Sequence, residues 1–208
     1  MPTIKEIAKA CNVSVATVSN IINHKGSVGD ATRERVEQVI REMNYTPNYV
    51  AKNLKTKNTR SIGVIAEDMT VFALPDIIDG ITEYCEEEDY QILLVNLRLY
   101  KKFQDKYYRD NRHKEIVRQE IQKLLAKQVE GIIYVAAHER LINIIPEDLP
   151  IPTVVAYGFT GSEKIPSVVV KDIKGAYDLV SYIVSKGHKK IGVIAGKKES
   201  IHTQSRLE

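Results

Sequence analysis

Apolar side chains in residues 3–23 recur with helical spacing in two short runs. The second run, Val15, Val18 and Ile22, falls at positions i, i+3 and i+7 of one helix. The segment Cys11-Asn12-Val13 interrupts the period and separates this run from the first one, which comprises Ile4, Ile7 and Ala8. The pattern predicts two short helices across a tight turn, with Val18 and Ile22 buried.

Capping residues predict where these two helices begin. Thr3 and Glu6 have the S/T-x-x-E spacing in which each side chain satisfies an unpaired amide of the other residue. A helix should therefore start at Ile4. Ser14 precedes the second apolar run and is suited to cap the second helix.

A third helix, about Ala31 to Met43, is expected after a polar turn at Gly26, where a positive φ is easiest for glycine. Gly29 is a weak cap for it, and Pro47 ends the element. Its apolar stripe should complete a three-helix core and comprises Val36, Val39, Ile40 and Met43.

From Ser61 onward, strand and helix patterns alternate, which is typical of a doubly wound parallel sheet in an α/β protein. The helix Leu74 to Glu87 should turn Ile77, Ile78, Ile81 and Tyr84 inward. The other expected helices are 113–127 and 173–186, and the expected strands are 62–66, 92–96, 132–136, 153–157, 167–170 and 190–195.

Composition is that of a soluble globular protein of 208 residues, with 43% hydrophobic and 27% charged residues. No apolar run is long enough to span a membrane, and no secretory signal pattern opens the chain. Cys11 and Cys85 are too few and too far apart to indicate a disulfide framework or a C-x-x-C metal site. A cytoplasmic location is expected.

Positive charge is concentrated near the N-terminus. Residues 1–60 contain ten Lys and Arg against five Asp and Glu, a net charge of +5, whereas the remainder contains twenty against twenty-two, a net charge of −2. The outward face of the second predicted helix, Ala16, Thr17, Ser19 and Asn20, carries no carboxylate. Both features favour nucleic-acid binding, although two surface helices of an ordinary helical bundle are the alternative.

Several motifs follow one another in the order typical of one family: Thr-Ile-Lys-Glu-Ile-Ala at 3–8, Val-Ser-Val-Ala-Thr-Val-Ser at 13–19, Thr-Arg-Glu-Arg-Val at 32–36, Tyr-Thr-Pro-Asn at 45–48, and Gly-His-Lys-Lys-Ile-Gly-Val-Ile-Ala-Gly at 187–196. Together they resemble the LacI/GalR family of bacterial transcription repressors over essentially the whole chain. The resemblance implies four parts: a helix-turn-helix DNA-binding headpiece (1–47), a hinge helix and linker (48–60), the N-terminal subdomain of a periplasmic-binding-protein-like core (61–162), and a partial C-terminal subdomain (163–208).

The resemblance also implies roles for particular residues in binding palindromic operator DNA. The positions that match base contacts are Val15, Ala16 and Asn20. In the hinge, Leu54 would wedge into the minor groove with Ala51 beside it, a disordered linker being the alternative. Residues suited to phosphate contacts are Thr3, Ser14, Thr17, Ser19, Asn23 and Thr32.

A small-molecule effector, expected to be a sugar, should bind at the carboxyl ends of the strands. The positions that match the effector cleft of the family are Phe72, Asn96, Tyr157 and Arg206, for which packing at the rim and a free arginine are the alternatives. The helix Leu74 to Glu87 is expected to support a homodimer.

No catalytic or cofactor-binding constellation is predicted. G-x-G-x-x-G, Walker A and H-E-x-x-H patterns do not occur, and no nucleophile accompanies His188 and Asp172. The alternatives to a repressor are a free-standing sugar-binding or enzymatic α/β domain with an incidental helical extension, or a non-functional truncated fragment. The family pattern would continue past Glu208, so truncation is expected, and residues 97–112 replace a shorter loop of the family.

Overall fold

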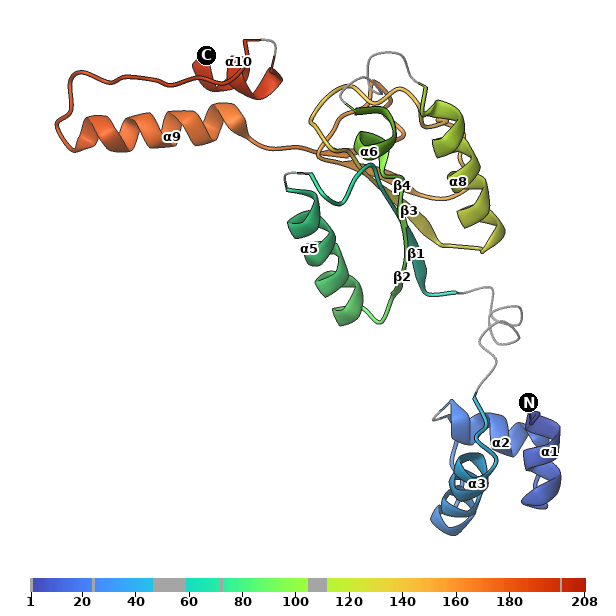
Figure 1. Cartoon of the computed structure of the whole chain (residues 1–208). Helices are drawn as coiled ribbons and strands as arrows, with labels where there is room; N and C mark the ends of the chain where they lie inside the picture. The colour runs from blue at the N-terminus through green and yellow to red at the C-terminus, as the bar shows by residue number, and fades with distance from the viewer. Residues whose placement is uncertain (1, 24, 47–58, 72, 105–111, 199) are drawn as a thin grey trace. The chain divides into compact units, whose positions relative to one another are not determined.

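The computed structural model describes residues 2–23, 25–46, 59–71, 73–104, 112–198 and 200–208. The chain divides into two compact units, Met1–Lys57 and Asn58–Glu208, which are drawn in Figure 1. Among the described residues, no helix combines the length and the apolar character needed to cross a membrane.

The first unit contains α1 (Ile4–Ala10), α2 (Val15–Ile22) and α3 (Asp30–Glu42). The predicted helix starts at Ile4 and after Ser14 are confirmed. One core prediction needs correction, because Ile21 is only 2% exposed and is the more deeply buried of two adjacent isoleucines, whereas Ile22 is half-buried. The buried core comprises Ile7, Ala8, Cys11, Val18, Ile21 and Val36.

The second unit is built on a five-stranded parallel sheet with strand order β2-β1-β3-β4-β5. The chain therefore winds first to one side of β1 and then to the other, which confirms the predicted doubly wound α/β architecture. The strands are β1 (Ser61–Ala66), β2 (Gln91–Asn96), β3 (Gly131–Val135), β4 (Thr153–Ala156) and β5 (Ser167–Val168).

Helices cover both faces of this sheet, α5 (Leu74–Glu87) on one face and α8 (Lys114–Ala126) on the other (Figure 1). Helix α8 approaches β1 closely at Gly63, where an added Cβ would lie 2.7 Å from Cδ1 of Leu124. The inward orientation predicted for Tyr84 is wrong, since this residue is 64% exposed and Cys85 is the buried one.

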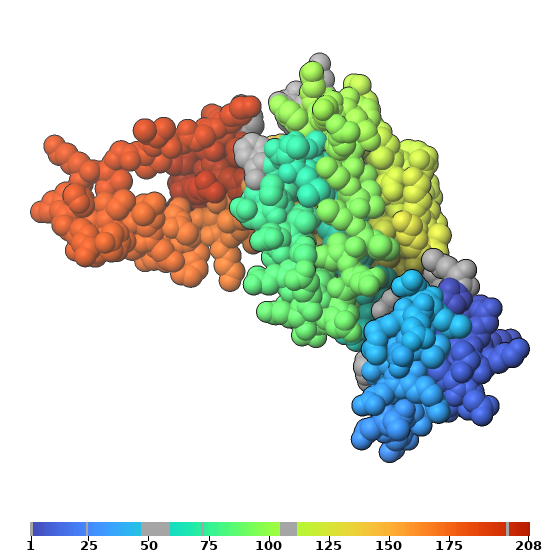
Figure 2. All heavy atoms as spheres, turned by 60° about the horizontal axis from the view of Figure 1, so that its bottom comes forward, coloured from blue at the N-terminus to red at the C-terminus, as the bar shows by residue number. Residues whose placement is uncertain are grey.

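The C-terminal part differs most from the sequence prediction. It contains α9 (Asp172–Ser185) and a short helix, α10 (Ile201–Leu207), which the pattern did not predict, as it did not predict α6 (Leu99–Phe103). The expected strand at 190–195 is wrong, because this segment pairs with no described strand and Ile194 is fully exposed. The side chains of α9 lie at the surface in Figure 2, and Asp172 is its one buried residue.

Candidate nucleic-acid interface and effector site

Two caps hold the helix-turn-helix of the first unit. Thr3 and Glu6 form the predicted capping box, in which the Thr3 amide donates to Glu6 Oε2 at 2.6 Å and the Glu6 amide donates to Thr3 Oγ1 at 3.3 Å. Ser14 Oγ accepts from the Thr17 amide at 3.0 Å and lies 2.8 Å from Thr17 Oγ1. Each cap satisfies a backbone amide in the first turn of its helix.

The exposed face of α2 contains the three residues matched to base contacts. Val15 is 42% exposed, and Ala16 and Asn20 are also exposed. The first turn of α2 contains no acidic residue, so the partial positive charge of this helix terminus is uncompensated by any carboxylate there. This face suits a polyanion.

The residues matched to phosphate contacts are not equally available. Thr3 and Ser14 are exposed, while their hydroxyls already serve the caps. The side-chain amide of Asn23 donates to the Ser19 carbonyl oxygen at 2.7 Å. Thr17, Ser19, Asn23 and Thr32 are half-buried.

The turn after α2 adopts the predicted glycine conformation. Gly26 has φ of +73°, and an added Cβ there would lie 3.4 Å from Nδ2 of Asn20. The amide of Lys25 also donates to the Asn20 carbonyl oxygen at 2.8 Å. The turn therefore folds back beside Asn20.

Three of the predicted site residues lie outside the described residues. They are Ala51 and Leu54 of the hinge and Phe72 of the effector cleft.

At the carboxyl end of β2, the Asn96 side chain binds its neighbouring loops. Its Oδ1 accepts from the amides of Arg98, at 3.1 Å, and Met69, at 3.5 Å. Two strands, β1 and β3, lie between β2 and β4 in the sheet, so Asn96 is not brought together with Tyr157.

Tyr157 and Arg206 do meet, through two residues that the sequence prediction missed as site residues. The Tyr157 ring stacks on the His202 ring, with centroids 5.7 Å apart and planes 24° apart. Arg206 Nε donates to Asp172 Oδ1 at 2.5 Å, and His202 Nδ1 contacts Asp172 Oδ2. The partners of Asp172 are therefore on α10, and His188 is not among them.

Charges around this cluster shift the pKa values of two of its groups. Burial alone raises the pKa of Asp172, but hydrogen bonds from His202 and Arg206, together with their charges, outweigh burial and hold the pKa below its usual value. The pKa of the Tyr157 hydroxyl is raised, mainly by burial and to a smaller extent by the negative charges of Glu139 and Asp172.

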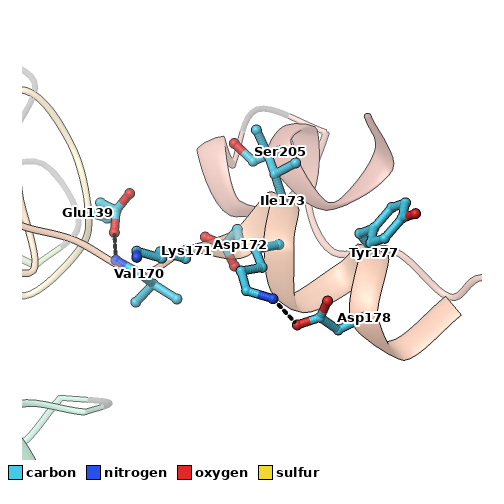
Figure 3. A pocket seen from close by; sticks show the side chains of 9 residues that line it. Glu139, Val170, Lys171, Asp172, Ile173, Tyr177, Asp178 and Ser205 are labelled. Carbon is cyan, nitrogen blue, oxygen red and sulfur yellow. Dashed lines mark hydrogen bonds and ion pairs between the residues drawn. The ribbon is translucent and has the colours of Figure 1, made fainter. Parts of the chain in front are cut away.

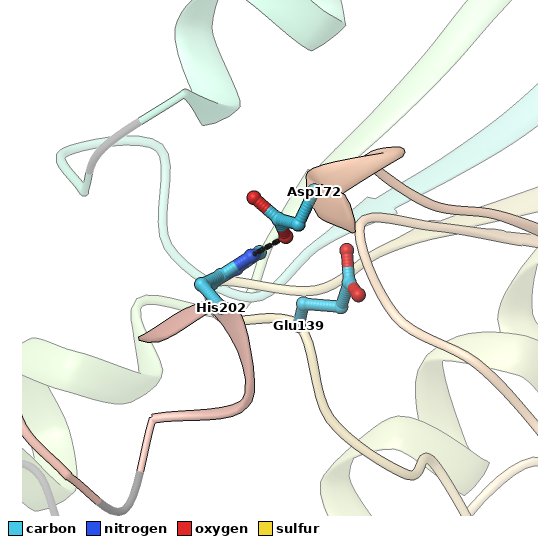
Figure 4. A group of neighbouring side chains, drawn as sticks. All are labelled: Glu139, Asp172 and His202. Atoms are coloured by element: carbon cyan, nitrogen blue, oxygen red, sulfur yellow. Dashed lines mark hydrogen bonds and ion pairs between the residues drawn. The ribbon is translucent and has the colours of Figure 1, made fainter. Parts of the chain in front are cut away.

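The same cluster is the one group of described residues that could hold a metal ion. One ligand atom each from Glu139, Asp172 and His202 lies within 4.8 Å of the others (Figure 4). Both Asp172 oxygens, however, already interact with Arg206 and His202. A cation bound by Asp172 would therefore have to displace one of these partners.

A pocket of about 600 Å³ lies next to the cluster (Figure 3). It is bounded by Glu139, whose Oε2 accepts from the Val170 amide at 3.1 Å, and by the first turns of α9. Its lining is mixed in charge and contains Lys171, Asp172, Lys174, Tyr177, Asp178 and Ser205.

A buried ion pair occupies the switch point of the sheet, between β1 and β3. Glu67 is 0% exposed and accepts from Arg140 Nη2 at 2.6 Å, Arg140 Nη1 at 3.0 Å, the Tyr134 hydroxyl at 2.6 Å and the Ala137 amide at 2.8 Å. The only sequence signal was the position of Glu67 directly after a strand. This pair holds the loop that carries Glu139.

Replacing Asp172 by asparagine should release α10, because the neutral amide loses the ion pair with Arg206 and the contact with His202. We expect amide hydrogen exchange in α10 to become about tenfold faster, which corresponds to about 1.4 kcal/mol. The matched control is Asp178→Asn on the same helix, which breaks only the exposed pair with Lys174. Equal exchange in both variants would contradict the role of Asp172.

The known families agree with this architecture. Residues 3–48 match the family described as "Bacterial regulatory proteins, lacI family", and residues 59–208 match "Periplasmic binding proteins and sugar binding domain of LacI family". The chain belongs to the lacI family.

Similar curated proteins include the HTH-type transcriptional repressor PurR of Vibrio vulnificus, which is 30% identical over 100% of this chain and 59% of its own length. The HTH-type transcriptional regulator RegA of Clostridium saccharobutylicum is 32% identical over 96% of this chain and 57% of its own length. The ribose operon repressor of Haemophilus influenzae is 27% identical over 100% of this chain and 59% of its own length. The chain thus spans less than two thirds of the length of each.

Among solved structures, the lac repressor dimer bound to operator and the anti-inducer ONPF has a TM-score of 0.72 and 24% identity, over 99% of this chain and 59% of that chain. This similarity supports the fold.

Proposed function

We propose that this protein is a sequence-specific DNA-binding repressor of a bacterial operon, responsive to a sugar or another small molecule. The observation that carries the proposal is the capped helix-turn-helix whose second helix exposes Val15, Ala16 and Asn20 without an acidic residue in its first turn. The repressors named above, which are related along nearly the whole of this chain, support it.

The proposal assigns parts of the chain as the sequence predicts. Residues 1–47 bind DNA, 48–60 form the hinge with Ala51 and Leu54 at the minor groove, and 61–162 and 163–208 contribute to effector binding. The compact units Met1–Lys57 and Asn58–Glu208 are compatible with this division. Two copies would place two headpieces on the half-sites of a palindrome.

The proposed effector site is the cluster in which Tyr157 and Arg206 are joined through His202 and Asp172. The Tyr157 ring offers a face on which a sugar could stack. The carboxylates of Glu139 and Asp172 and the guanidinium of Arg206 offer hydrogen-bond acceptors and donors for the hydroxyl groups of the effector. Asn96, which lies at the end of β2 and away from Tyr157, and Phe72 are assigned to this cleft by resemblance alone.

Asn20→Arg should change which base pair is preferred. An asparagine side chain suits adenine, whereas arginine forms a bidentate pair with guanine, each worth about 1–3 kcal/mol of discrimination. Selection of random duplexes by both proteins should therefore move the preference at one position of each half-site from A·T to G·C.

The control is Gln38→Arg, which adds the same charge on the exposed surface of α3 and should leave the selected sequence unchanged. Identical motifs from all three proteins would reject the role of Asn20. If the wild-type protein shows no salt-dependent preference for a palindrome, a free-standing ligand-binding or enzymatic domain becomes the better hypothesis.

A further inference from the structure

The chain enters the sheet of the second unit through a tightly held pair of residues, Thr59 and Arg60. The Arg60 guanidinium donates from Nε to the Asp89 carbonyl oxygen at 2.8 Å and also binds the Glu88 carbonyl oxygen. Its Cζ lies 4.8 Å from the centroid of the Tyr90 ring. One side of the entry point is thus fixed to the loop before β2.

The other side is fixed to the loop before β3. The Arg60 amide donates to Glu130 Oε1 at 2.6 Å, and the Thr59 hydroxyl donates to the Gln128 carbonyl oxygen at 2.7 Å. The second carboxylate oxygen of Glu130 lies 3.3 Å from the Tyr90 hydroxyl. Glu130 therefore links both loops to the incoming backbone.

The backbone at this point adopts an unfavourable conformation. Arg60 has φ of +44°, a left-handed conformation that costs free energy for any residue with a Cβ. Such a conformation persists where the surrounding contacts over-determine it. The contacts of Arg60 and Glu130 supply this constraint. They therefore fix the direction of the backbone immediately before β1.

We propose that Arg60 and Glu130 form a linker clamp, a pair of positioning residues that fixes how the chain leaves the sheet and so raises affinity for operator. Binding two half-sites at a set spacing depends on how narrowly the linker restricts the headpieces, because a wider distribution lowers their effective concentration at the second half-site. Non-specific binding depends on phosphate contacts and needs no such restriction. The inference rests on the proposed function for its effect on DNA.

The first test needs no DNA. Trypsin digestion of the whole chain, followed by mass spectrometry, measures cleavage after Arg60 relative to cleavage after Arg118, an exposed residue within α8. In Glu130→Gln the ratio should rise at least about tenfold, because the neutral amide holds the Arg60 backbone less strongly than a carboxylate does. The matched control is Glu120→Gln, which removes only the surface pair with Lys123 and should leave cleavage after Arg60 unchanged.

The second test compares affinity for a duplex selected by the wild-type protein with affinity for a scrambled duplex. Glu130→Gln should lose about tenfold in affinity for the selected duplex and keep its affinity for the scrambled one. An unchanged cleavage ratio would overturn the clamp, as would equal acceleration of both cleavages. If Glu130→Gln increases cleavage after Arg60 but keeps the full preference for the selected duplex, the role of the clamp in DNA binding is overturned. A wild-type protein without any preference would instead refute the proposed function, and the digestion would still decide whether the clamp exists.

Discussion

Glu67→Gln is expected to lower the free energy of unfolding of the second unit by about 3 kcal/mol, near the lower end of the range for a broken buried ion pair. The substitution leaves the Arg140 guanidinium, which is 18% exposed, without its carboxylate. The hydrogen bonds from Tyr134 and Ala137 also lose a charged acceptor. The partial contact of Arg140 with water is the reason to expect the lower end.

The effect should depend on pH in a defined direction. Burial raises the pKa of Glu67, but the charge and hydrogen bonds of Arg140 and the bonds from Ala137 and Tyr134 outweigh burial, so the folded-state pKa is lowered. The carboxylate therefore stabilises the fold fully above the unfolded-state pKa of about 4.3. This contribution disappears as the pH falls through the folded-state pKa.

Urea unfolding, followed by amide exchange in β1 and β3, measures the change at pH 7 and at lower pH. The difference between wild type and Glu67→Gln should shrink below about pH 4. Glu120→Gln, which alters a surface pair with Lys123, should unfold within about 0.5 kcal/mol of wild type. A Glu67→Gln variant as stable as this control would contradict the importance of the buried pair.

Ile21→Ala should cost about 2–5 kcal/mol, the usual range for truncating a buried isoleucine. Ile21 is 2% exposed and packs in the core of the Met1–Lys57 unit. Small units bury little surface and have little stability in reserve. We therefore expect this unit to unfold and DNA binding to be lost, while the second unit stays folded.

The neighbouring variant Ile22→Ala is the matched control. Ile22 is only half-buried against the same core, so its truncation should cost less and should leave the helices folded. Circular dichroism at the helix band and operator titration measure both variants. A larger loss for Ile22→Ala would mean that the periodicity, which favoured Ile22 over Ile21, was the better guide.

Local signals were sufficient for most of the secondary structure. The Thr3–Glu6 spacing and Ser14 predicted two helix starts that the structure confirms. Leu74 to Glu87 was predicted with its observed bounds. Such signals act within about one helical turn or along one strand, so a sequence displays them without any knowledge of the fold.

Failures occurred where a second part of the chain decides the outcome. Residues 190–195 have a strand pattern, but a strand needs a partner for its backbone hydrogen bonds, and no described strand pairs with it. Tyr84 fits the helical stripe of α5 but lies at its exposed edge. Periodicity gives the face of a helix and leaves the width of the covered stripe undetermined.

The sequence by itself determined the class of the protein, the caps and helices of the headpiece, the alternation that produces a parallel sheet, and the outward face of α2. Tertiary structure alone decided the partners of the buried charges. Glu67 meets Arg140 across 73 positions, and Asp172 meets His202 and Arg206 across 30 and 34. Such contacts carry no local periodicity, because they depend on strand order and on the loops that the sheet brings together at its carboxyl edge.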